Sequence, residues 1–150
     1  MSRFSLFTVC AIAGLVCVSC DESLRSITGP TPDLAPTFTS IQREIFTSTD
    51  SAGRAACTSC HTTAGGRVPP AGMDLGSANA HAQLVNVASN VKAGAIRVIP
   101  GDPENSYLIH KLEGRSGIVG LRMPRPGPPY LTEGQVRVIK RWIELGALNN

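Results

Sequence analysis

The sequence predicts an all-α domain built from about four short helices that are joined by long loops. Apolar residues recur at helical spacing in four segments, and two of these segments open on a capping box. Alternation with the period of a β-strand is weak throughout, and glycine and proline separate the helical segments. The predicted domain spans residues 38–150, which is enough chain for one small core.

The first two helices are predicted in the first half of this domain. Thr39 and Gln42 form a capping box at the start of a helix over residues 38–46. Ser77 is the expected N-cap of a shorter helix that runs through His81, Leu84, Val85 and Ala88. Glycine- and proline-rich loops are expected between the two.

The last two helices carry clearer signals at both ends. Asp102, which is followed by proline, is the expected N-cap of the third helix, and Gly114 is its expected end. Thr132 and Gln135 make the second capping box, and it opens a helix that Gly146 stops.

The motif with the most specific chemistry is CTSCH at residues 57–61, a CxxCH pattern of the kind that attaches and ligates c-type haem. On a helical turn, residues three and four apart share a face. Cys57 and Cys60 are then expected to bind the two vinyl groups of the haem, and His61 its iron. The alternatives are a redox-active CxxC pair, which would accompany a βαβ pattern, and half of a zinc site, which would need a second ligand pair.

The N-terminal segment predicts export. Arg3 precedes an apolar run over residues 4–18, which is shorter than the ~20 residues of a membrane-spanning helix and typical of a signal peptide. The run ends in CVSC, which resembles a bacterial lipoprotein processing site that would leave Cys20 acylated. Cys17 departs from that pattern, since leucine is usual there, and ordinary cleavage with release of a soluble protein is the alternative.

The predicted organisation is therefore a signal peptide of lipoprotein type (1–20), a proline-containing spacer (21–37) and one domain (38–150). The expected location is the periplasmic or cell-envelope side of a bacterial membrane, with peripheral association through the lipid. Nucleic-acid binding is not expected, because the charge is near neutral and no basic stripe with interleaved aromatic residues is present.

These assignments account for every cysteine. Cys10 and Cys17 fall in the removed segment, Cys20 would carry lipid, and Cys57 and Cys60 would carry the haem. No cysteine is left for a structural disulfide, so the domain's stability is expected to come from packing around the cofactor.

A second chemical signal is the methionine of Arg122-Met123-Pro124. Haem iron that is bound by one histidine has an open sixth position, and a methionine there raises the reduction potential. Met123 lies among prolines that reduce the entropy lost when the loop orders. Met73 is the other methionine of the predicted mature chain, although methionine usually fills gaps in a core. His81, expected to be hydrogen-bonded at the core edge, and His110, expected to face solvent, are the rival sixth ligands.

Four motifs in this order resemble the class I-like bacterial cytochrome c domains, and more narrowly the planctomycete-type cytochrome c family. They are CTSCH at 57–61, RVIPGDPENSYLIHKLEG at 97–114, RMP at 122–124 and LTEGQVRVIKRWIELGA at 131–147. The segment 48–56, which is longer and more polar than usual, departs from the family pattern.

The resemblance implies a small cytochrome c fold whose loops wrap around one covalently bound haem c. It implies thioether bonds at Cys57 and Cys60, His61 as the proximal iron ligand and Met123 as the distal one. It also implies that the first and last helices pack together, with Phe46 against Trp142 as the expected contact. Candidate donors to the haem propionates are Arg97, Tyr107, Arg115, Arg122 and Trp142.

The predicted function is that of an exported mono-haem cytochrome that carries single electrons to or from an unidentified redox partner protein and is not itself an enzyme. The alternative is a haem-containing accessory or sensor domain that binds a small ligand or serves a partner oxidoreductase. An exported structural domain without haem is the third hypothesis.

Overall fold

The computed structural model describes residues 34–76 and 78–150. Within these residues the protein is mostly helical, and its only β-type pairs are three isolated bridges, so the predicted all-α class is confirmed. The predicted signal peptide with Cys20, most of the predicted spacer and Ser77 lie outside the described residues. No helix in the described part of the chain is long and apolar enough to cross a membrane.

The first helical segment consists of α2 (Phe38–Ile41), which continues directly as a π-helical turn, η1 (Gln42–Phe46). Thr37 is its N-cap, because its hydroxyl oxygen accepts a hydrogen bond from the Ser40 amide at 3.3 Å. The predicted capping box at Thr39 and Gln42 is therefore wrong.

The side chains of Thr39 and Gln42 have distant partners instead. The Thr39 hydroxyl donates to the Asn150 carbonyl oxygen at 2.7 Å, and Gln42 Nε2 donates to the Leu75 carbonyl oxygen at 2.8 Å. Both contacts join segments far apart in the sequence, which is why a local pattern misplaced the cap. Leu34 is already buried in the core, four residues before α2 begins.

Helix α3 (Ala80–Leu84) is shorter than the predicted element, which reached residue 88. The chain turns extended at Val85, where isolated bridges pair Val85 with Val98 and Ala88 with Ile96. The predicted cap at Ser77 lies outside the described residues, and Asn79 occupies the N-cap position of α3.

Helix α4 (Tyr107–Glu113) begins later than predicted and ends where predicted. Ser106 is at the N-cap position, whereas Asp102 stabilises the preceding turn by accepting a hydrogen bond from the Asn105 amide at 3.1 Å. Gly114 ends the helix in the left-handed conformation, with φ at 72°. A Cβ at Gly114 would lie 2.9 Å from Arg122 Cδ, so a larger residue there would also displace the Arg122 side chain.

Helix α5 (Glu133–Glu144) has the predicted capping box. The Gln135 amide donates to the Thr132 hydroxyl oxygen at 3.1 Å, and the Thr132 amide donates to Gln135 Oε1 at 3.0 Å. Gly146, with φ at 98°, follows the helix end as predicted. The face that α5 buries consists mainly of Val136, Ile139, Trp142 and Ile143.

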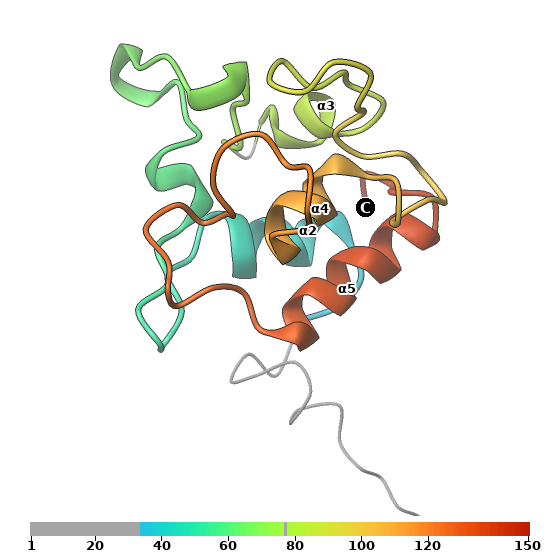
Figure 1. Ribbon diagram of the computed structural model, residues 1–150. Helices are drawn as coiled ribbons and strands as arrows, with labels where there is room; N and C mark the ends of the chain where they lie inside the picture. The colour runs from blue at the N-terminus through green and yellow to red at the C-terminus, as the bar shows by residue number, and fades with distance from the viewer. Residues whose placement is uncertain (1–33, 77) are drawn as a thin grey trace, which may run out of the picture.

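The core lies where α2, α4 and α5 meet (Figure 1). The first and last helices pack together, but the aromatic ring against Trp142 is that of Phe38, with centroids 5.5 Å apart, rather than that of Phe46. Phe38 lies between the two, since its centroid is 6.4 Å from that of Phe46. The Trp142 indole donates to the Leu148 carbonyl oxygen at 2.8 Å.

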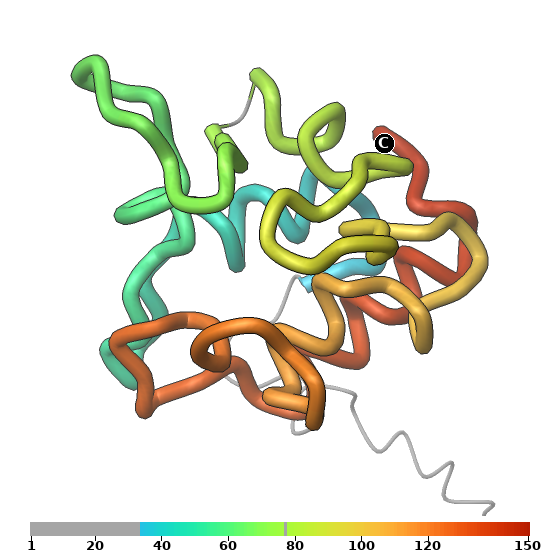
Figure 2. Tube along the Cα trace, turned by 45° about the horizontal axis from the view of Figure 1, so that its top comes forward, coloured from blue at the N-terminus to red at the C-terminus, as the bar shows by residue number. Residues whose placement is uncertain are grey.

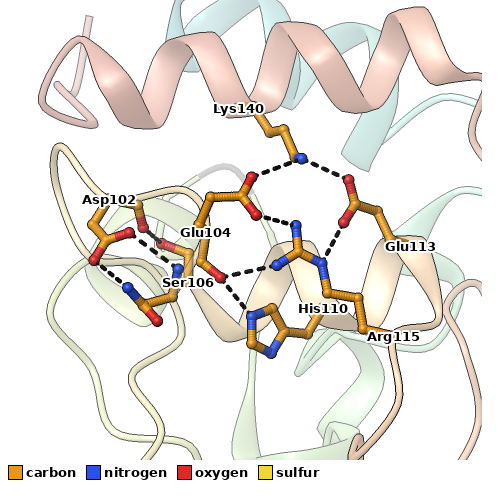
Figure 3. A network of polar contacts seen from close by, with 8 residues as sticks. Asp102, Glu104, Ser106, His110, Glu113, Arg115 and Lys140 are labelled. Carbon is orange, nitrogen blue, oxygen red and sulfur yellow. Dashed lines mark hydrogen bonds and ion pairs between the residues drawn. The ribbon is translucent and has the colours of Figure 1, made fainter.

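A network of charged side chains ties the loop before α4 to α4 and α5 (Figure 3). Lys140 lies 3.0 Å from a Glu104 carboxylate oxygen and 2.8 Å from one of Glu113. Arg115 pairs with both of these carboxylates, and these contacts hold the pKa values of Glu104 and Glu113 below their ordinary range. The network is partly exposed, so its contribution to stability is small.

Candidate functional site

One cavity of about 470 Å³ contains every residue that the sequence predicted at the iron or at the thioether bonds. Cys57, Cys60 and His61 line it from one segment, and Met123 lines it from the loop that follows α4. Figures 1 and 2 show both segments on the side of the molecule away from the C-terminus. The structure thus brings together residues that are far apart in the sequence.

The CxxCH motif forms a helical turn, which is the condition under which its cysteines and histidine share a face. The turn is η2 (Cys57–Ser59), and the Cys57 carbonyl oxygen accepts hydrogen bonds from the amides of Cys60, at 3.2 Å, and His61, at 2.9 Å. The hydroxyl of Thr58 donates to the Phe46 carbonyl oxygen at 3.3 Å, which fixes the turn against η1. Cys57 and Cys60 are free thiols.

Arg54 organises the segment 48–56, the part that departs from the family pattern. Its side chain is fully buried, and its guanidinium lies 3.1 Å from Asp50 Oδ2. It also donates to the carbonyl oxygens of Ile45 and Ser48, both at 3.3 Å. A buried cation therefore connects η1 to the residues just before the motif, and sequence reasoning missed it because arginine is usually a surface residue.

The thiol of Cys57 is protonated at neutral pH. Burial raises its pKa to about 11, and the nearby positive charge of Arg54 only partly opposes this effect. Cys60 is exposed at the cavity.

His61 is buried beneath the cavity and is neutral at neutral pH. Burial lowers the pKa of its imidazole, and polar backbone groups of Met73 and Pro70 act in the opposite direction. Neither group is in hydrogen-bond geometry with Nδ1, which is buried and has no hydrogen-bond partner among the described residues. A neutral imidazole is the form that binds a metal ion.

Two methionines line the cavity, and they reach it from different elements. Met73 is on the segment bound to the motif, since its amide donates to Pro70 and the amide of Leu75 donates to the His61 carbonyl oxygen at 2.9 Å. The Met123 amide instead donates to the Lys111 carbonyl oxygen of α4 at 2.9 Å. Both side chains are partly buried against the core.

The two rival histidines have partners elsewhere and do not line the cavity. His81 Nε2 lies 2.8 Å from the Ala147 carbonyl oxygen, and its ring packs edge-on against Phe38, so its predicted place at the core edge is confirmed. His110 Nε2 lies 2.7 Å from the Glu104 carbonyl oxygen in the charged network (Figure 3).

Of the five candidate donors to a propionate, Arg97 and Tyr107 line the cavity. Arg97 is buried, and it donates to the carbonyl oxygens of Gln83, at 2.7 Å, and Ala71, at 2.9 Å. The other three are engaged away from it: Arg115 in the charged network, Arg122 over the Tyr130 ring and Trp142 with Leu148.

Lys111 and Arg125 also line the cavity, and sequence reasoning missed both. Helical spacing gives a signal for Lys111, because it follows Tyr107 by four residues and so shares its face of α4. Among the described residues no carboxylate side chain lines the cavity, so its charged groups are all cationic.

The described residues contain no group of three or more histidine, cysteine and acidic side chains that could hold a metal ion by themselves. Comparison of the chain with protein-family models, curated proteins and solved structures found no match. A functional assignment therefore depends on the motifs and on the geometry of this cavity.

Proposed function

We propose that the protein is an exported mono-haem c-type cytochrome that transfers single electrons. The observation that carries the proposal is the composition of one cavity. It is lined by both cysteines and the histidine of CxxCH and by Met123, which a separate loop supplies.

The residues of the cavity fit a haem. Its volume lies in the range of ~300–1,000 Å³ that is typical of small-molecule and cofactor sites. Free thiols are available at Cys57 and Cys60, and His61 is neutral with an unpartnered Nδ1. The cations Arg97, Lys111 and Arg125 suit a group that carries carboxylates.

In this proposal Cys57 and Cys60 hold the haem through thioether bonds, His61 is the proximal ligand and Met123 the distal ligand. Bound in this way, haem iron supplies one-electron exchange at a potential that the axial ligands and the burial of the site determine. Burial keeps His61 in its neutral, ligating form. The apolar residues around it, such as Phe46, Leu75 and Leu112, limit the access of water.

Two protein ligands would leave no position on the iron for a substrate, and this supports a carrier rather than an enzyme. The alternative function, a haem sensor or an accessory domain of an oxidoreductase, requires Met123 to leave. The loop that carries Met123 is partly exposed, since Val119 is 50% exposed and Leu121 is 60% exposed. This exposure is compatible with the alternative function.

We also propose that the signal peptide directs export and that lipid on Cys20 holds the domain on the cell-envelope side of the membrane. Several acyl chains on one cysteine would exceed the single chain that binds a membrane only marginally. The redox partner is then another protein at that membrane surface.

The experiment is expression of the full chain with a haem-attachment system. Intact mass of the mature protein is expected to show one haem and the lipid, and the haem is expected to persist through denaturing electrophoresis. The matched control is the Cys57→Ala, Cys60→Ala variant, which should lose the attached haem. Haem that extracts freely from the wild-type protein into acidified organic solvent would refute covalent attachment.

A further inference from the structure

The loop over residues 115–130, here called the distal loop, is bound to α4 over a short stretch that ends at Met123. The Val119 amide donates to the Tyr107 hydroxyl oxygen at 2.8 Å, and the Met123 amide donates to the Lys111 carbonyl oxygen at 2.9 Å. Arg122 Nε donates to the Leu112 carbonyl oxygen at 2.8 Å. Met123 is thus the last residue of a segment that follows the surface of α4.

Lys111 makes more of these contacts than any other residue of α4. Its ammonium donates to the carbonyl oxygens of Val119, at 2.9 Å, and of Leu121. Its own carbonyl oxygen is the acceptor for the Met123 amide. One residue therefore binds the segment at both ends, and its side chain also lines the cavity.

Apolar burial does little to hold this segment. Val119 and Leu121 are half or more exposed, and Met123 is only partly buried. Because burial contributes about 25 cal/mol for each Å² of apolar surface removed from water, exposed side chains add little. Hydrogen bonds to a charged donor are the stronger kind, so the ammonium of Lys111 is the main anchor.

We propose that Lys111 is a positioning residue for Met123, which it holds at the cavity by binding the backbone of residues 119–123. This inference rests on the proposed function, in which Met123 is the distal iron ligand. A thioether is a weak ligand, so its affinity for iron depends on how well the loop is held in place beforehand.

The test is the Lys111→Met variant of the holoprotein, which keeps the long side chain and removes the ammonium. Imidazole is the probe, because it binds ferric iron only in the fraction of molecules from which Met123 has left. Its apparent affinity scales with that fraction. Loss of one charge-assisted hydrogen bond corresponds to roughly a tenfold change, so imidazole should bind at least about tenfold more tightly.

Two matched variants separate the anchor from a general effect of charge. Lys111→Arg keeps a charged donor and should stay close to wild type. Lys92→Met removes another ammonium bound to the distal loop, 2.9 Å from the Gly117 carbonyl oxygen, outside the 119–123 segment. It should leave the imidazole affinity within about twofold of wild type.

The methionine–iron charge-transfer band in the far red distinguishes failure of the Lys111 proposal from failure of the Met123 assignment. A band in wild type that Met123→Ala abolishes supports the distal ligand independently of Lys111. If Lys111→Met then keeps wild-type imidazole affinity, or Lys92→Met matches its increase, the role of Lys111 is refuted alone. A wild-type protein with covalent haem but no such band refutes both.

If Lys111→Met does not fold, a second variant tests the anchoring of the same segment. Tyr107→Phe removes only the hydroxyl that accepts from the Val119 amide. It should weaken the same segment and raise the imidazole affinity in the same direction, by less than tenfold. An unchanged affinity in folded Tyr107→Phe would count against the anchoring of residues 119–123 to α4.

Discussion

The two walls of the cavity are held in different ways. The proximal wall, residues 54–75, is fixed by a buried guanidinium at Arg54 and by backbone hydrogen bonds within the CxxCH turn. The distal loop is fixed by polar contacts to α4, and two of its apolar side chains are at least half exposed. The anchor of the proximal wall is therefore a buried charge, whereas the anchors of the distal loop are partly exposed polar contacts to the helix that precedes it.

This difference indicates which wall of the cavity would be rigid and which would open more readily. Removing a buried charge disturbs the fold, because its partner stays uncompensated in the interior. Removing a contact at the distal loop mainly changes how often the loop opens. The first change should appear in stability, and the second in ligand binding and in the spectrum.

The largest effect is expected from loss of Met123, the proposed distal ligand. Met123→Ala should abolish the far-red charge-transfer band of the ferric holoprotein, lower the reduction potential and open the iron to cyanide or carbon monoxide. Absorption spectra and a redox titration measure the change.

Met73→Ala is the matched control, because Met73 lines the same cavity from the proximal wall. It should keep the band and cost less than the ~2–5 kcal/mol of a fully buried methionine, since Met73 is only partly buried. A band that survives Met123→Ala and disappears in Met73→Ala would reassign the ligand to the proximal side.

A smaller effect, on stability, is expected at Arg54. Arg54→Met leaves Asp50 without its cation and the carbonyl oxygens of Ile45 and Ser48 without a donor. The free energy of unfolding should fall by about 3–5 kcal/mol, which urea denaturation followed by circular dichroism measures.

Arg141→Met provides the comparison, because Arg141 forms an exposed pair with Glu144 on α5. Its cost should be within about 1 kcal/mol. Equal costs for the two variants would show that the Arg54 cluster does not hold the proximal wall.

The smallest effect is expected at Asp74, and it depends on pH. The carboxylate accepts hydrogen bonds from the Gly76 amide, the Thr63 hydroxyl and the Asn79 side chain, and these hold its pKa below the ordinary value. A group whose pKa is lowered by folding adds stability above its unfolded value, near pH ~4, and loses it as the pH falls through the folded pKa.

The stability advantage of wild type over Asp74→Asn should therefore be complete at neutral pH and shrink progressively below about pH 4. Denaturation curves at a series of pH values measure it, with Glu144→Gln as an exposed carboxylate control. An advantage that does not change across this range would mean that Asp74 acts through its shape and not through its charge.

The parts of the fold that the sequence predicted best are those that depend on residues close together in the chain. The Thr132–Gln135 capping box and the Gly114 helix end each depend on residues within one turn, and both are confirmed. The start of α2 was misplaced because Thr39 binds Asn150, more than a hundred positions away. The start of α4 was misplaced because Asp102 stabilises a turn of its own.

The same contrast, between features set by neighbouring residues and features set by distant contacts, applies to the functional site. The CxxCH motif forms the helical turn that its interpretation assumed, and the structure brings Met123 to the same cavity as that motif. Arg54 had no comparable signal, and for Lys111 helical spacing indicates only the face of α4 that it shares with Tyr107. Their importance arises from which carbonyl oxygens the folded chain presents to them, and sequence spacing does not contain that information.

The contacts of Asn150 bear on the order in which the chain can fold. Its side-chain oxygen accepts from the Phe38 amide at 3.0 Å, and its carbonyl oxygen accepts from the Thr39 amide at 2.8 Å. These amides belong to the first turn of α2, which has no partners of its own for them. In a chain that emerges N-terminus first, water is the partner of these two amides until residue 150 has arrived. The first turn of α2 is therefore completed only when both ends of the domain are present.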